Sequence, residues 1–135
     1  MQYSTAVWDY FENPRHVGKL DPDDPRVGGA LVGTVGQGGA LSLQIQVNAQ
    51  GVIEQARFKA YGCGVTIATA AWVAEWLHGK HLTEALRLAD SDICQALELA
   101  PAKLHCAVRA VRAVRAAIAN YEAKRQALAV ECDKD

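Results

Sequence analysis

The pattern of apolar and polar residues changes its period near the middle of the chain. Every second residue from 41 to 47 is aliphatic and the residues between are polar, which is typical of a strand with one buried face. A turn at residues 48–51 precedes a second alternating run over residues 52–60, with Glu54 as a charged exception on its apolar side. With a further strand near residues 30–35, the pattern predicts a small three-stranded antiparallel sheet.

The other apolar positions recur at helical spacing. Residues 4–11 predict a short helix, and residues 64–79 predict a longer one with one apolar side and a glycine at its end. Two short helices are expected near residues 83–88 and 92–99. The last and longest is expected from Pro101 to about Gln126, a segment rich in alanine and free of glycine. Helices packed on one face of a short antiparallel sheet define an α+β fold.

Composition places these elements in one ordinary domain. The 135 residues are 50% hydrophobic and 21% charged, with a formal net charge of −1. We expect the domain over residues 1–126 and a flexible C-terminal tail over residues 127–135. Near-neutral charge argues against nucleic acid as a partner. No apolar stretch reaches the ~20 residues that span a membrane, and no export signal precedes the domain, so we expect a cytoplasmic location.

Four cysteines, at positions 63, 94, 106 and 132, then point to metal or redox chemistry, because thiols stay reduced in the cytoplasm. Cys63 and Cys106 fall near predicted helix N-termini, where the helix dipole favours thiolate, and His105 directly precedes Cys106. Taken alone, this set is more typical of buried, unreactive thiols with a surface histidine than of a metal site. Cys94 is expected to be a small core residue. Cys132 follows a helix too long for it to reach back to the others.

The last predicted helix also carries Arg109, Arg112 and Arg115 at intervals of three residues. A solvated basic edge beside a buried valine stripe is the favoured interpretation of this pattern. The alternative is a docking surface for an acidic partner.

Four short motifs carry a resemblance to a known family. In chain order they are residues 11–18 (FENPRHVG), 31–33 (LVG), 59–64 (KAYGCG) and 103–106 (KLHC). Together they span the chain from about Tyr3 to about Lys124 without a large gap. In these motifs the sequence resembles the IscU/NifU N-terminal family of iron–sulfur cluster assembly scaffolds.

The resemblance implies a site at one end of an α+β fold. It implies that Cys63, His105 and Cys106 bind iron or a labile [2Fe–2S] cluster, with zinc as another metal for the same ligands, and that Cys106 accepts sulfur. It also implies a scaffold and not an enzyme.

The implied partners are a cysteine desulfurase, an Hsp70-type chaperone with its J-protein co-chaperone, and a ferredoxin or frataxin-like protein. The family's chaperone-recognition segment reads Leu-Pro-Pro-Val-Lys. Its counterpart here has alanine at two of the five positions, which predicts weakened binding; it consists of Leu99, Ala100, Pro101, Ala102 and Lys103.

One departure from the family concerns the ligands themselves. Family members carry a further cysteine and an aspartate in an Ala-Cys-Gly-Asp loop. Counted from residues 31–33, Gln37 stands where that cysteine would be and Gly39 where the aspartate would be. A neutral amide is a poor ligand for iron, and a [2Fe–2S] core normally takes four protein ligands. The ligand set is therefore predicted to be incomplete.

Several functions remain open on these residues. The first is a scaffold that accepts sulfur and holds iron or a labile cluster with incomplete ligation. The second is a paralogue that docks on the desulfurase or chaperone as a regulator without assembling clusters. The third is a stable mononuclear zinc or iron site with an open fourth position. The fourth, and the least favoured by these residues, is a thiol hydrolase.

Overall fold

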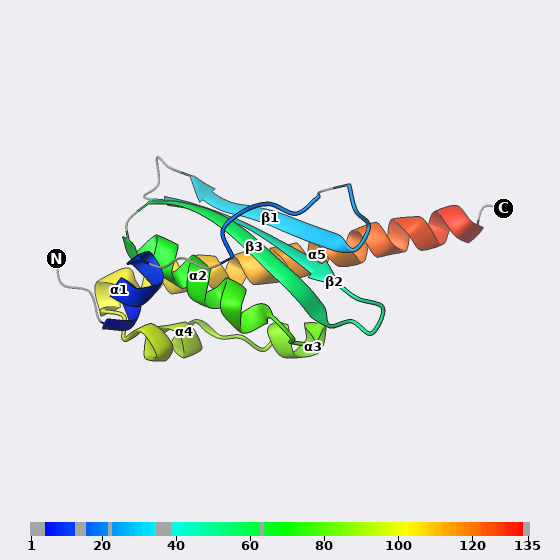
Figure 1. The fold of residues 1–135 in the computed structure, drawn as a ribbon. Coiled ribbons are helices and arrows are strands. Elements are labelled where there is room, and N and C mark those ends of the chain that lie inside the picture. The colour runs from blue at the N-terminus through cyan, green and yellow to red at the C-terminus, as the bar shows by residue number, and fades with distance from the viewer. Residues whose placement is uncertain (1–4, 13–15, 22, 35–38, 63, 134–135) are drawn as a thin grey trace.

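The computed structural model describes residues 5–12, 16–21, 23–34, 39–62 and 64–133, and within them the chain forms one antiparallel sheet with helices on one face (Figure 1). The strands lie in the order β1-β2-β3. Their bounds are Val27–Thr34 for β1, Gly39–Val47 for β2 and Ile53–Gly62 for β3. The predicted three-stranded sheet is confirmed, with β1 beginning earlier than expected.

A shift in strand register explains the charged exception at Glu54. Along β2, Leu41, Leu43, Ile45 and Val47 are buried against the helices, as the alternation predicts. Gln46 pairs with Gln55, but Val47 pairs with Ile53, so β3 has one extra residue at this point. Such a bulge moves the side chains beyond it to the other face. Glu54 is therefore exposed while Ile53 and Ala56 are both buried.

The helices follow the predicted order and complete the α+β fold. Leu99 and Ala100 link the fourth helix to a 3₁₀ turn, and α5 follows that turn directly. None of the helices within the described residues is long and apolar enough to cross a membrane. Their bounds are Thr5–Glu12 for α1, Gly64–Leu77 for α2, Leu82–Ala85 for α3, Asp90–Leu97 for α4, Pro101–Lys103 for the 3₁₀ turn and Leu104–Asp133 for α5.

The predicted end of the last helix is wrong. The helix expected to end near Gln126 continues to Asp133, so most of the segment 127–135 expected to be a flexible tail is helical. Residues 127–133 contain neither glycine nor proline, and alanine continues to favour helix there. Figure 1 shows this last part of α5 extending beyond the sheet, away from the rest of the fold.

Helix α2 occupies the centre of the core. Its spacing predicts one apolar side, but residues on nearly all of its faces are buried because α1, β3 and α5 all pack against it. Small residues such as Ala68, Ala71 and Ala74 allow these close approaches. The N-terminal end of α2 is thereby fixed next to the first turns of α5.

Helix α5 packs tightly along β1. The Lys124 Nζ atom donates a hydrogen bond of 2.8 Å to the Val27 carbonyl, and Asn120 Oδ1 accepts one of 3.0 Å from the Gly29 amide. Between them, Gly28 faces the backbone of α5 so closely that a Cβ atom would lie 2.6 Å from the Cβ atom of Tyr121. These contacts fix the strand to the helix that carries His105 and Cys106.

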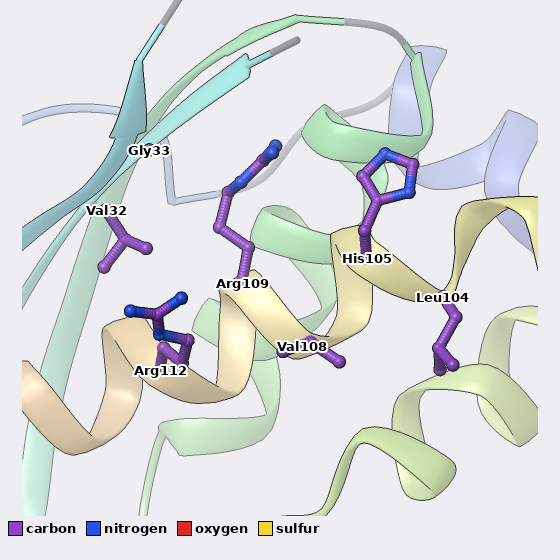
Figure 2. A pocket seen from close by; sticks show the side chains of 7 residues that line it. All are labelled: Val32, Gly33, Leu104, His105, Val108, Arg109 and Arg112. Atoms are coloured by element: carbon purple, nitrogen blue, oxygen red, sulfur yellow. The ribbon is translucent and has the colours of Figure 1, made fainter. Parts of the chain in front are cut away.

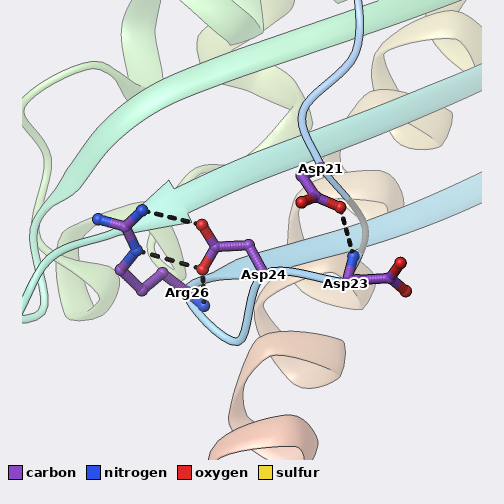
Figure 3. Close-up of polar contacts among 4 residues, drawn as sticks. All are labelled: Asp21, Asp23, Asp24 and Arg26. Atoms are coloured by element: carbon purple, nitrogen blue, oxygen red, sulfur yellow. Dashed lines mark hydrogen bonds and ion pairs between the residues drawn. The ribbon is translucent and has the colours of Figure 1, made fainter.

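The acidic connector before β1 is ordered by its own carboxylates (Figure 3). Asp21 accepts a hydrogen bond from the Asp23 amide, and Asp24 accepts from both the backbone and the guanidinium of Arg26. The hydrogen bonds from Arg26 hold the pKa of the Asp24 carboxyl below its usual value. This side-chain pairing is solvent-exposed, so it shapes the turn into β1 more than it stabilises the fold.

Candidate functional site

Cys106 lies in the first turn of α5, as the sequence predicts. Helix α5 begins at Leu104, directly after the 3₁₀ turn, so Cys106 is the third residue of the helix. The Cys106 sulfur lies 3.6 Å from the Thr66 hydroxyl oxygen, and Thr66 lies in the first turn of α2. The first turns of α2 and α5 thus meet at this thiol.

Cys106 is buried in this conformation. The residue is only 2% exposed, because α2 covers it on the Thr66 side. His105 is exposed, since adjacent residues on a helix point about 100° apart. Cys106 is therefore shielded from reagents in solution in this conformation, whereas His105 is not.

Two of the predicted site residues, Gln37 and Cys63, lie outside the described residues. The expected convergence of Cys63 with His105 and Cys106 therefore stays a prediction. Within the described ranges, no three His, Cys, Asp or Glu side chains group closely enough to hold a metal ion. His105 and Cys106 alone provide fewer donors than a [2Fe–2S] core or tetrahedral zinc requires.

Gly39, which stands where the family has its aspartate, is the first residue of β2. It packs against Arg109, a residue that the sequence analysis did not assign to the site. A Cβ atom at Gly39 would lie 2.9 Å from Arg109 Nη1, 2.9 Å from the Tyr61 carbonyl oxygen and 3.3 Å from Thr66 Oγ1. The guanidinium of Arg109 thus occupies the space next to Gly39, close to the thiol's neighbour Thr66. A positive charge stands where the family resemblance implies the negative charge of an aspartate.

Arg109 has an unusual environment for a surface helix residue. Its Nη1 atom is buried and has no hydrogen-bond partner among the residues that the structure describes. Its Nε atom would lie 3.0 Å from a Cβ atom at Gly33, so the side chain packs across the end of β1 and the start of β2, which pair with each other. The interpretation of Arg109 as part of a solvated basic edge is therefore wrong for this residue. The sequence contained a signal for this arrangement, because an arginine occurs one turn after Cys106 in a chain that lacks the aspartate at position 39.

The other candidate residues lie apart from this point. Cys94 is half-buried in α4, and neither it nor Cys106 forms a disulfide bond. The predicted chaperone segment forms a turn between α4 and α5, with Ala100 and Pro101 exposed and Lys103 half-buried. Its exposure is compatible with recognition by another protein.

Cys94 should react slowly with alkylating reagents at neutral pH. Burial raises the pKa of the Cys94 thiol, and the nearby charge of Asp90 raises it further. Because only the thiolate is nucleophilic, its rate with iodoacetamide should rise with pH to a midpoint above that of the same thiol in the denatured chain. Asp90→Asn should move that midpoint down. Equal midpoints in the folded and denatured chains would contradict the prediction.

The sequence of this chain is similar to a known family of domains and to proteins from bacteria. Residues 2–128 match the family described as the NifU-like N terminal domain. The chain is 50% identical over 127 residues to the iron–sulfur cluster assembly scaffold protein IscU of Escherichia coli strain K12, covering 94% of this chain and 99% of that protein. It is 47% identical over 125 residues to the protein of the same name from Azotobacter vinelandii, covering 93% and 98%.

Solved structures of low sequence identity share the fold. A putative iron–sulfur cluster assembly scaffold protein for the SUF system from Fervidobacterium islandicum AW-1 aligns with a TM-score of 0.70 at 16% identity, over 85% of this chain and 95% of that one. A nitrogen-fixing NifU-like protein, N-terminal part, from Brucella abortus aligns with a TM-score of 0.69 at 15% identity, over 90% and 94%.

Proposed function

This chain belongs to the family of NifU-like N-terminal domains, and we propose that it is an iron–sulfur cluster assembly scaffold whose own ligand set is incomplete. The observation that carries the proposal is the 50% identity, over nearly the whole of both chains, to a protein named for that role. The role is that of a carrier and not of an enzyme. Iron and sulfide are its cargo, and a [2Fe–2S] cluster is the form that the cysteine positions suit best.

In this proposal Cys106 is the sulfur acceptor and, with Cys63 and His105, a ligand of the cargo. The Cys106 thiolate attacks the terminal sulfur of a persulfide on a cysteine desulfurase. The bond between that sulfur and the desulfurase cysteine breaks, and the desulfurase cysteine leaves as a thiolate. Cys106 then carries the persulfide, and the helix N-termini around it stabilise its negative charge.

The burial of Cys106 supports a transfer that depends on the docked partner. A thiol that is 2% exposed reacts slowly with small persulfides in solution, whereas a docked desulfurase can displace the elements around it. An Hsp70-type chaperone with its J-protein would bind the exposed turn around Pro101. These partners, a ferredoxin or frataxin-like protein, and a cytoplasmic location are parts of the same proposal.

We expect desulfurase and cysteine to place sulfur on Cys106 and not on Cys94. Mass spectrometry of the protein after the reaction maps the added sulfur, and Cys106→Ser should abolish most of it while Cys94→Ser should not. Without the desulfurase, small persulfides should label Cys106 at least about tenfold more slowly. Sulfur on Cys132 alone, or none despite measured desulfurase binding, would favour the docking paralogue over the sulfur-accepting scaffold.

A further inference from the structure

A hollow of about 500 Å³ opens beside the first turns of α5 (Figure 2). It lies between this helix and the end of β1, next to the candidate site but not lined by Cys106. One wall is apolar and the other is basic. The residues that line it are Val32, Gly33, Leu104, His105, Val108, Arg109 and Arg112.

The basic wall contains Arg109, the residue whose buried guanidinium nitrogen is described above. Arg109 Nη1 is shielded from solvent and has no hydrogen-bond partner within the described part of the chain. A buried donor on a charged group normally has a partner, because an unpaired one loses its hydration without compensation. An anion in the hollow would compensate the charge of this group and hydrogen-bond the remaining donors of the same guanidinium. The environment of Arg109 therefore indicates a ligand of negative charge.

A second guanidinium faces the same hollow. Arg112 lies three residues after Arg109, so both rise from neighbouring positions on α5, and Figure 2 shows Arg112 reaching toward Val32. His105 lies one turn before Arg109 and also lines the hollow. Within the described residues, neither arginine has an ion pair with a carboxylate. Asp90 lines an adjoining hollow together with Arg112 and Arg115.

The apolar wall determines what kind of anion fits. Val32, Val108 and Leu104 line the hollow, and the latter two are 38% and 44% exposed. A volume of about 500 Å³ is far larger than an inorganic ion and falls in the range of small-molecule sites. Two guanidinium groups can hold an oxyanion in several hydrogen bonds, while the apolar wall favours a hydrocarbon body.

We propose that this hollow is a binding site for a small organic oxyanion, whose charged group lies between Arg109 and Arg112 and whose apolar body lies against Val32 and Val108. The charged group is a carboxylate or a phosphate ester, since both match the guanidinium donors. No lining residue is the sulfur acceptor, and His105 is the one lining residue that the proposed cargo site shares. It does not require a metal or a cluster.

The test titrates the full chain with hexanoate, hexyl phosphate and inorganic sulfate at a fixed 0.1 M ionic strength. Two-dimensional NMR follows the amides of Val32, Gly33 and Val108, and thermal unfolding gives a second measurement. Saturable shifts at these amides with hexanoate or hexyl phosphate are expected, with sulfate at least tenfold weaker. The tighter of the two hexyl compounds identifies carboxylate or phosphate as the natural charged group.

Arg109→Met should weaken that binding at least tenfold and remove the ligand-induced rise in Tm. The matched control is Arg125→Met, which removes an exposed arginine of the same helix outside the hollow and should change binding less than twofold. Equal losses in both variants, equal binding of sulfate, or no saturable shift with either hexyl compound would overturn the proposal. Each of these results is separable from failure of the scaffold function, since sulfur transfer to Cys106 is measured without these ligands.

Discussion

Gly28→Ala is expected to destabilise the fold by about 3 kcal/mol, which is a large share of the stability of a domain of this size. A Cβ atom at Gly28 would overlap the Ala117 carbonyl oxygen and lie 2.6 Å from Tyr121 Cβ and 2.9 Å from the Tyr121 amide nitrogen. Most of these are backbone atoms of α5, so no side-chain rotation relieves the overlap. Strand β1 and α5 must separate, and their two flanking hydrogen bonds are strained with them.

The neighbouring glycine provides a matched control for this prediction. A Cβ atom at Gly29 would come closest to the Gln44 side chain, at 3.3 Å to its Cγ, and that flexible group can move aside. Gly29→Ala should therefore change stability by less than about 1 kcal/mol. In thermal unfolding experiments, Gly28→Ala should have a Tm roughly 10 °C below that of the unchanged protein, and the control should be lower by only a few degrees. Similar Tm values for the two variants would show that β1 and α5 do not pack as closely as described.

The packing of β1 on α5 shows which part of the fold the sequence could predict. Alternation and helical spacing identify each strand and helix, because those periods follow directly from backbone geometry. They do not indicate which glycine faces a helix, since Gly28 and Gly29 are indistinguishable in a pattern of apolar and polar residues. The bulge beside Glu54 is visible in the sequence only as an exception to the alternation.

For the candidate site, too, some features could be predicted from the sequence and others could not. The place of Cys106 at a helix N-terminus follows from Pro101 and the long alanine-rich segment after it, and the structure has that arrangement. Its burial could not be predicted, because it depends on the tertiary approach of Thr66 from α2. The same holds for Arg109, whose spacing with Arg112 and Arg115 resembles an ordinary surface stripe until the strand ends are placed around it.

An experiment that restores the cysteine and the aspartate missing from this chain must also take account of Arg109. Gln37→Cys with Gly39→Asp supplies the thiolate and the carboxylate that the family resemblance implies. However, the introduced carboxylate would start next to Arg109 Nη1 and form a charge-assisted hydrogen bond with it. Gly39 also has a φ of 153° and lies close to the Tyr61 carbonyl, so a side chain there requires the start of β2 to shift. The double variant alone should therefore bind zinc and retain a cluster little better than the unchanged protein.

Adding Arg109→Leu to that double variant is expected to raise zinc affinity on the order of 100-fold over the double variant, because the carboxylate is then free to face the metal and a repelling charge is gone. Chelator competition measures zinc, and anaerobic reconstitution with iron, sulfide and desulfurase, read by visible absorption, measures cluster retention. Arg125→Leu in the same double background is the matched control for loss of a positive charge on α5, and Gly39→Ala reports the strain at that position by its Tm. If the Arg125 control gains as much, or if the double variant already reaches the full affinity, the guanidinium at Gly39 is not what limits metal binding at this site.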